Sequence, residues 1–341
     1  MVTIKDVAKA ANVAPSTVSR VMSDNPHISK KTKIKVKAAM EQLEYQPNNA
    51  ARTLVTKQSN TIGIIQKSGH NEIKQNPFMI DVLIGIYNKC KACNYATIST
   101  TSEAYEDLQN EVDRMINYHS LDGFILLYSK QNDEIENILI EQEIPYVVIG
   151  KALGNNKAIH IDNDNVKASR ELTQSLIESR HSNILFVAEK GDYEVVNDRI
   201  EGFKDIVQQN DIISNIIHFE MQRDDILAYF KKLCSDNQLP TAIITSDTML
   251  NHMVLSVLYE LKIKIPDDLH TATFNDSYLN EFASPPQTAV NINPKLLGEV
   301  AGASVIDLIQ GQPIKQYNRF IKTNIVHRIS TKNRMKEICD E

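Results

Sequence analysis

The stretch "VAKAANVAPSTVSRVMSDNP", residues 7–26, decides the fold of the amino-terminal part of this chain. Apolar residues recur along it at helical spacing, and Pro15 interrupts the pattern once. Proline suits the first turn of a helix, because N–H groups there have no intrahelical acceptor, and it pushes the preceding residue into the extended region that an N-cap adopts. Pro15 therefore predicts the start of a second helix, through about residue 23, with Val18 and Val21 facing inward.

Two further helices are predicted around it. Thr3 and Asp6 form a variant of the capping box, which starts a first helix near residue 4. Ser29 is the expected cap of a third helix, whose mostly inward residues should be Ile34, Val36, Ala38, Met40 and Leu43. Two helices joined by a short turn, with a third packed across them, make a helix-turn-helix unit, whose second helix enters the major groove of DNA.

The charge distribution agrees with a DNA-binding head. The net charge of the whole chain is −6, but the first 60 residues carry ten Lys and Arg against four acidic residues. Lysines crowd the third helix at positions 30, 31, 33, 35 and 37. Such a run is usually a solvated face, but beside a helix-turn-helix it can neutralise phosphates. The following segment, "NNAARTLVTK" at 48–57, is too short for a stable isolated helix and is expected to fold on DNA or on pairing with a second copy.

The rest of the chain alternates β-rich and helical runs. Two series of buried strands are predicted, at 61–66, 95–100, 122–129 and 144–151, and then at 182–190, 215–221, 241–247 and 270–276. Helical patterns lie between them, for example at 78–94, 106–120, 194–210 and 248–264. This alternation predicts an α/β fold with two doubly wound lobes. Ligands of such sheets bind beyond the carboxyl ends of the strands, so a cleft between the lobes is the expected site.

Several classes of function are disfavoured. No apolar run approaches the roughly 18 residues that span a bilayer, and no secretory signal is visible, so a cytoplasmic protein without a membrane partner is expected. Dinucleotide, P-loop, nucleophile-elbow and zincin motifs are absent, although a Ser-His-Asp set of distant residues stays open. No metal or cofactor is expected. Cys90 and Cys93 form a CxxC, a metal or redox pattern, but no second CxxC or HxxxH accompanies it, which favours reduced thiols in a helix.

The segments "TIKDVAKAANVAPSTVSRVM", "YQPNNAARTL" and "TIGII" resemble the lactose-repressor family of bacterial regulators. The resemblance implies a homodimer that binds operator double-stranded DNA, with Leu54 wedged into a minor-groove step and Arg20 able to bridge a guanine. One departure is Ala14, where the family usually has Ser. The DNA-binding residues that the resemblance implies are Thr3, Pro15, Ser16, Thr17, Ser19, Arg20, Ser23, His27, Asn48, Arg52 and Leu54.

The body resembles the same family, which shares its two-lobed fold with periplasmic sugar-binding proteins. The pieces "NPF", "LLYS", "VVIGK", "IDNDN" and "FND…ASPPQT" are most similar to its maltose-operon branch in Gram-positive bacteria, which implies maltose or a malto-oligosaccharide as effector. The effector-binding residues so implied are Phe78, Tyr128, Asp162, Arg199, Asp247 and Asn275.

Four of these residues also have a plainer interpretation. Arg199 could be a surface helix residue, Asn275 could cap a turn, and Asp247 could serve as an N-cap. Phe78 could belong to the core. Asn275 stands where many relatives carry Asp, and its amide offers two donors and one acceptor without charge, which suits a neutral polyol.

The resemblance also implies the domain boundaries. We expect a headpiece at 1–46, a hinge helix and linker at 47–59, and an effector and dimerisation domain at 60–341. Its N-lobe should comprise about 60–161 and 290–321, and its C-lobe about 162–289 and 322–341. The end "STKNRMKEICDE" lacks the leucine heptads of tetrameric relatives, which favours a dimer. A regulator with another sugar or a protein co-regulator stays open, as does a sugar-binding or sugar-processing protein.

Overall fold

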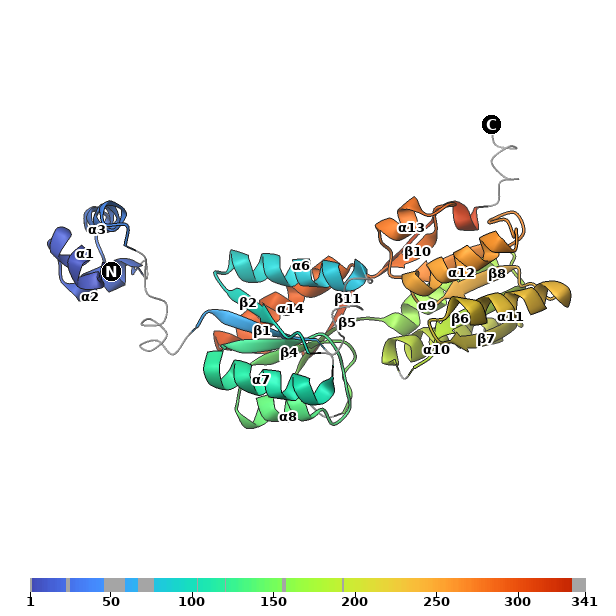
Figure 1. The fold of residues 1–341 in the computed structure, drawn as a ribbon, viewed down its shortest axis with the longest axis horizontal. Coiled ribbons are helices and arrows are strands. Elements are labelled where there is room, and N and C mark those ends of the chain that lie inside the picture. The colour runs from blue at the N-terminus through green and yellow to red at the C-terminus, as the bar shows by residue number, and fades with distance from the viewer. Residues whose placement is uncertain are drawn as a thin grey trace, which may run out of the picture. The chain divides into compact units, whose positions relative to one another are not determined.

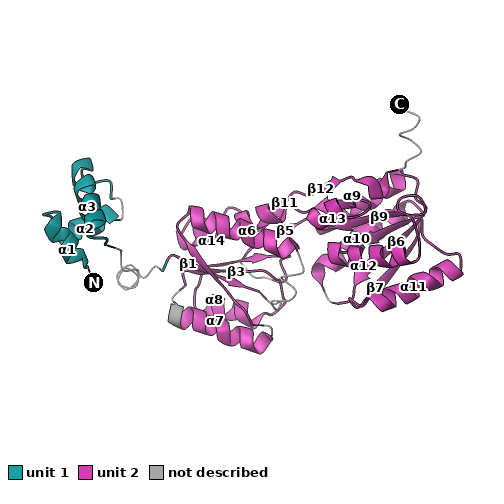
Figure 2. Ribbon diagram, turned by 45° about the horizontal axis from the view of Figure 1, so that its top comes forward, with its two compact units in different colours: residues 1–59 teal, residues 60–341 magenta. Residues whose placement is uncertain are grey.

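The computed structural model of the chain describes residues 2–22, 25–45, 59–66, 77–102, 104–119, 121–154, 158–191 and 193–332. The chain divides into two compact units, residues 1–59 and 60–341 (Figure 2). Several predictions fall outside the described residues, namely those for Ser23, Asn48, Arg52 and Leu54, for the hinge over 47–58, and for the end of the chain from 333.

The first unit is built from α1 (Ile4–Ala10), α2 (Pro15–Met22) and α3 (Lys30–Gln42). The Asp6 carboxylate accepts hydrogen bonds from the backbone N–H and the hydroxyl of Thr3, at 2.8 and 2.7 Å, and so fixes the start of α1. The Ser29 hydroxyl accepts a hydrogen bond from the N–H of Thr32 and caps α3. Pro15 begins α2, as predicted.

The core of this unit is small and apolar. Val18 and Val21 of α2 are buried against α1 and α3, as predicted. On α3, the prediction that Ile34 and Ala38 face inward is wrong, because Ile34 is 70% exposed and Ala38 is also exposed. The inward stripe of α3 consists of Val36, Ala39, Met40 and Leu43. Since each residue turns a helix by about 100°, positions two residues from Val36 lie on the opposite side.

The second unit contains two six-stranded sheets (Figure 1). The first sheet has the strand order β11-β5-β4-β3-β1-β2, and the second has the order β12-β10-β9-β8-β6-β7. Neighbouring strands are parallel in both, except that β12 runs antiparallel to β10. The strands of the first sheet are β1 (Thr61–Ile65), β2 (Ala96–Ser99), β3 (Gly123–Leu126), β4 (Tyr146–Ile149), β5 (Ile159–Asn163) and β11 (Asn318–Ile321). Those of the second are β6 (Asn183–Glu189), β7 (Ile213–Phe219), β8 (Ala242–Thr245), β9 (His270–Phe274), β10 (Thr288–Asn291) and β12 (Asn324–Val326).

Helices cover both faces of each sheet, which confirms the predicted doubly wound α/β class. On the first sheet, one core lies under α6 (Pro77–Ala92) and α14 (Pro294–Ile309), and the other under α7 (Tyr105–His119) and α8 (Glu134–Glu141). On the second sheet, α9 (Asn165–Glu178) and α10 (Glu194–Gln209) cover one face, while α11 (Arg223–Ser235) and α12 (Thr248–Glu260) cover the other. The short helix α13 spans Tyr278–Phe282, and a 3₁₀ turn spans Ile329–Thr331.

The chain passes between the two sheets three times, after β5, after β10 and between β11 and β12. β5 stays in the first sheet up to Asn163, whose buried side-chain amide donates hydrogen bonds to the carbonyls of Ile292 and Ile321, at 3.0 and 2.9 Å. These carbonyls belong to the second and third crossings. One amide therefore ties the three connections together.

No helix among the described residues is long and apolar enough to cross a membrane.

Candidate functional site

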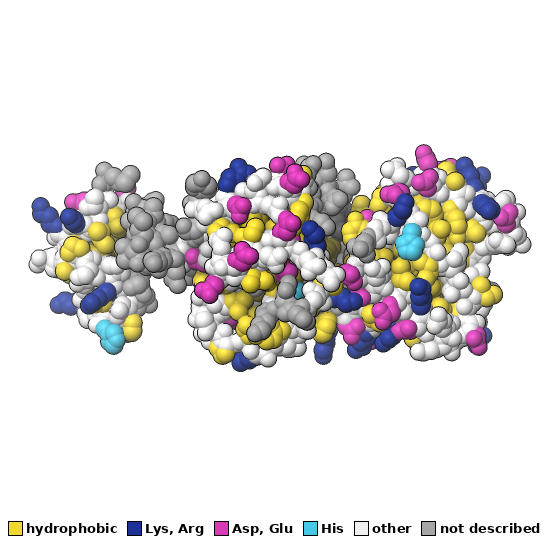
Figure 3. Space-filling model, turned by 90° about the horizontal axis from the view of Figure 1, so that it is seen from below, with side chains coloured by type: hydrophobic (Ala, Val, Ile, Leu, Met, Phe, Trp, Pro, Cys, Tyr) yellow, Lys and Arg dark blue, Asp and Glu magenta, His cyan; other side chains and the backbone are white. Residues whose placement is uncertain are grey.

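The outer face of α2 carries the side chains that sequence reasoning assigned to DNA. Ser16, Ser19 and Arg20 are exposed, as is Pro15, while Thr17 is half-buried. Ser16 and Arg20 are four residues apart and so share one face of the helix. The other two described candidates, Thr3 and His27, are exposed at the start of α1 and after α2. Figure 3 shows Lys and Arg side chains on the surface of this unit, which suits contact with a polyanion.

A second set of polar residues surrounds Arg199, which lies on α10 and is 3% exposed. Its Nη1 donates a hydrogen bond to the carbonyl of Ser246, at 2.7 Å, and its Nη2 donates to Oδ1 of Asn275, at 2.9 Å. Its Cζ lies 4.5 Å from the centre of the Phe274 ring. The interpretation of Arg199 as a surface residue is therefore wrong. Burial lowers its pKa to about 10, which leaves it protonated at neutral pH.

Asn275 and Asp247 complete this network from the carboxyl ends of β9 and β8. The Asn275 amide donates to Oδ2 of Asp247, at 2.6 Å, while Oδ1 of Asp247 accepts the N–H of Met249 and caps α12. Asp247 thus serves as an N-cap and as a partner of Asn275 at the same time. Asn275 has a φ of 63°, a left-handed conformation that Asn adopts more readily than most residues. We refer to Arg199, Asn275 and Asp247 as the strand-end network.

Asp162 lies close to this network at the end of β5. Its Oδ1 accepts hydrogen bonds from the N–H of Asn163, at 2.7 Å, and from the side-chain amide of Asn165, at 3.3 Å. Desolvation raises the pKa of Asp162 to about 6; Asp198 raises it further, whereas Arg199 lowers it. The carboxyl group therefore changes charge near physiological pH.

Replacing Asp162 by asparagine should stabilise the protein above pH 6. The raised pKa means that ionised Asp162 disfavours the folded state, so stability is lost as the pH rises from the unfolded value near 4 through 6. Urea unfolding of D162N should show a gain of about 1–3 kcal/mol at pH 8. The gain should vanish below about pH 4, where both carboxyls are protonated. A gain that is constant from pH 4 to pH 8 would contradict this assignment.

Phe78 and Tyr128 lie in different surroundings. Phe78, near the start of α6, packs against the cores of both sheets and so touches both lobes. Tyr128 follows β3 and packs instead into the core under α7 and α8. Burial raises the pKa of its phenol, and Asp133 adds to the shift. Among the described residues, no hydrogen bond joins Tyr128 to the strand-end network, and its part in effector binding stays a prediction.

Sequence reasoning missed a pair of charges beside the network. Nζ of Lys151, just after β4, lies 2.6 Å from Oδ1 of Asp198 on α10. The two residues belong to different lobes. Lys151 ends the segment "VVIGK" and Asp198 precedes Arg199 in the sequence, but their pairing depends on how the two lobes face each other, which spacing along the chain does not encode.

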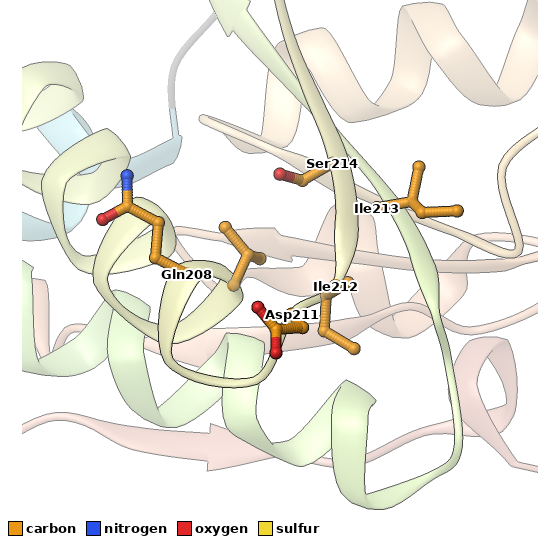
Figure 4. A pocket seen from close by; sticks show the side chains of 6 residues that line it. Gln208, Asp211, Ile212, Ile213 and Ser214 are labelled. Atoms are coloured by element: carbon orange, nitrogen blue, oxygen red, sulfur yellow. The ribbon is translucent and has the colours of Figure 1, made fainter.

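A surface hollow of about 370 Å³ lies elsewhere, between the end of α10 and the start of β7 (Figure 4). Gln208, Asp211, Ile212, Ile213 and Ser214 are among its lining residues. The start of β7 is the amino end of a parallel strand, whereas Asp247 and Asn275 follow carboxyl ends. The hollow is therefore at the opposite end of the second sheet from the strand-end network, and we do not assign the effector to it.

The CxxC pair lies at the end of α6. Cys90 is fully buried, and burial raises its pKa to about 11, so its thiol is protonated and packs as an apolar residue. Among the described residues, no group of three or more His, Cys, Asp and Glu side chains is arranged to hold a metal ion.

Two family models match different parts of the chain. The family of bacterial regulatory proteins called the lacI family matches residues 3–48, and the periplasmic binding protein-like domain matches residues 173–331. The transcriptional regulator MalR of Staphylococcus xylosus is 58% identical over 331 residues, which cover 97% of this chain and 98% of that protein.

Two solved structures have a similar fold. A staphylococcal protein described as a probable maltose operon transcriptional repressor is 42% identical, with a TM-score of 0.76, and the match covers 81% of this chain and 99% of that one. The lac repressor dimer bound to operator has a TM-score of 0.81 over 97% of this chain and 99% of its own, at 21% identity, and supports the fold alone. The chain therefore belongs to the lacI family of bacterial regulatory proteins, and it is a DNA-binding transcriptional repressor with a periplasmic-binding-protein-like body.

Proposed function

We propose that this repressor is a cytoplasmic homodimer whose affinity for operator DNA is controlled by maltose or a malto-oligosaccharide. The strand-end network carries the proposal, because a buried arginine, an amide and a carboxylate together provide both hydrogen-bond donors and hydrogen-bond acceptors. Phe78, Tyr128 and Asp162 are proposed to line the same site. The names of the relatives, a MalR regulator and a maltose operon repressor, support maltose as the sugar.

The proposed DNA contacts are those of α2 and its neighbours. Arg20 is proposed to bridge the O6 and N7 atoms of a guanine, with Ser16 and Thr17 as more permissive contacts. Pro15 has no N–H to donate, so it can read a base only by apolar contact. Ser29 caps α3 beside a row of lysines that can neutralise phosphates. These contacts would fix both affinity and salt dependence.

The chemistry of the network favours an uncharged ligand. Asn275 offers donors and an acceptor without adding charge to a site that already holds Arg199 and Asp247. A carboxylate at position 275 would lie against Asp247, with which the Asn275 amide is now hydrogen-bonded at 2.6 Å. Sugar hydroxyls, which both donate and accept, match such a set. The sugar can shift operator binding only through its different affinities for two arrangements of the protein.

An operator gel shift at fixed salt, with and without maltose, tests the proposal. We expect maltose to lower the operator affinity of the full chain. Cellobiose, an isomer that differs in its glycosidic linkage, should have little effect. If the operator affinity is the same with and without maltose, maltose control is refuted. An effect of another sugar alone would assign the protein a different effector.

The dimer is proposed to form through α6. Ile80, Ile84 and Tyr87 lie at helical spacing on one face of this helix and are 43%, 39% and 39% exposed. Replacing Ile84 by glutamate would bury a charge in the proposed contact, so sedimentation should show I84E as a monomer with operator affinity reduced at least about tenfold. As a control, I213E changes an isoleucine that is 69% exposed on β7 and should remain dimeric. A dimeric I84E would exclude this face.

A further inference from the structure

The ion pair between Lys151 and Asp198 joins the two lobes beside the strand-end network. Lys151 follows β4 of the first sheet, and Asp198 lies on α10, which packs on the second. Their charged atoms are 2.6 Å apart, and Oε2 of Glu194, one helical turn before Asp198, is 3.9 Å from the same Nζ. A single lysine therefore faces two carboxylates on one face of α10.

The two members of the pair differ in their exposure. The side chain of Asp198 is 10% exposed, whereas that of Lys151 is 43% exposed. The hydrogen bond that Lys151 donates to Asp198 raises the pKa of Lys151, so the lysine stays charged. An enclosed carboxylate that lost this partner would be left without its nearest positive charge, which is unfavourable. When the lobes separate, water must take the place of the lysine.

Asp198 is also next in sequence to Arg199, and the two side chains leave the same turn of α10. A contact that holds Asp198 against the first lobe therefore also fixes the position of Arg199 relative to Asp162, at the end of β5. Phe78 adds an apolar contact to both lobes in the same arrangement. The ion pair thus acts on the position of the strand-end network without belonging to it.

We propose that Lys151 is a positioning residue that holds the lobes closed through Asp198 and Glu194 and so keeps Arg199 in place for the effector. The part that concerns the sugar rests on the proposed function. The closure itself does not, because both members of the ion pair are side chains of this chain. A protein that closes before the sugar arrives binds it more tightly, since only the closed fraction is competent to bind.

Small-angle X-ray scattering on the full chain without sugar tests the closure. We expect K151M to have a larger radius of gyration than the wild-type protein, and K151E, which repels both carboxylates, to have the largest. K151R should match the wild-type value, because it keeps the charge. High salt should expand the wild-type protein towards K151M and leave K151M unchanged. K190M is the matched control, since it breaks a 2.9 Å ion pair with Glu220 that is exposed on both sides.

Calorimetry with maltose on the same variants tests the positioning. K151M should bind about fivefold more weakly and K151E at least about twentyfold more weakly, whereas K151R and K190M should stay within about twofold of the wild-type protein. Equal radii of gyration in all variants would overturn the proposal, whatever maltose does. A loss of affinity in K151M that K151R shares, together with lower stability in urea, would also overturn it. If the wild-type protein ignores maltose while the radii follow the expected series, the proposed effector fails and the closure stands.

Discussion

Replacing Arg199 by methionine is expected to weaken maltose binding by about 2–4 kcal/mol, or roughly 30- to 1000-fold. The guanidinium holds the Ser246 carbonyl and the Asn275 side chain in place, and methionine leaves both without that donor. Asp162 also loses a positive charge that lowers its pKa, so the pKa of this carboxyl group should rise further. Calorimetry should show the loss of binding, and a gel shift should show operator binding that maltose no longer alters.

Two variants separate the role of Arg199 from general damage. R199K keeps the charge but cannot reach the carbonyl and the amide with one rigid fork, so an intermediate loss is expected. R170M removes an arginine that pairs with Asp205 on the exposed side of α9 and should bind maltose as the wild-type protein does. A folded R199M with an unchanged maltose response would remove Arg199 from the effector site.

The second large effect is expected from Arg20. R20A should lose about 1–3 kcal/mol of affinity for the cognate operator and should discriminate less at one base pair. Arg20 is exposed on the same face of α2 as Ser16, and Pro15 has no N–H for a base. The discrimination of this helix should therefore depend strongly on the arginine.

Gel shifts against operators that carry each single base change would measure this effect. A loss that is uniform across all sequences would show that Arg20 holds a phosphate. K37A supplies the comparison for that outcome, because a lysine that contacts a phosphate should weaken all sequences equally and lower the salt slope by about one. The unfolding transition of R20A should match that of the wild-type protein, since Val18 and Val21, not Arg20, form the core of α2.

Local chemistry made most of the fold predictable. Thr3, Pro15 and Ser29 start their helices through contacts within three residues, so the sequence alone places those starts. The eight predicted strands are present. Six of them are buried, as predicted, but β2 and β7 are edge strands and largely exposed, so the prediction that these two are buried is wrong. The prediction for Ile34 was wrong because it assumed that an apolar residue faces inward. The helical period through Val36 decides which side of the helix is buried.

The strands at the crossings and the ion pair between the lobes were harder to predict from the sequence. β5, β10, β11 and β12 lie at the crossings between the sheets. One partner of β5 is distant in the chain, because β5 pairs with β11, more than 150 residues away. Arg199, Asn275 and Asp247 could be nominated only through the family resemblance, but their mutual hydrogen bonds follow from strand order. No sequence pattern pointed to the role of Lys151, because its partner Asp198 belongs to the other lobe.

The side-chain amide of Asn163 fixes a point about which the two lobes of the body can rotate. Because the three connections are tied at one point, a change in the angle between the lobes moves each atom in proportion to its distance from that point. The carboxyl end of β1 lies on the side of the sheet where ligands of such folds bind, whereas Thr61, at its amino end, is where the chain arrives from the headpiece. A small rotation of one lobe caused by a sugar would therefore displace Thr61, and the displacement would grow with the distance of Thr61 from Asn163. Neither the sugar nor the residues that hold it need to touch the DNA-binding unit.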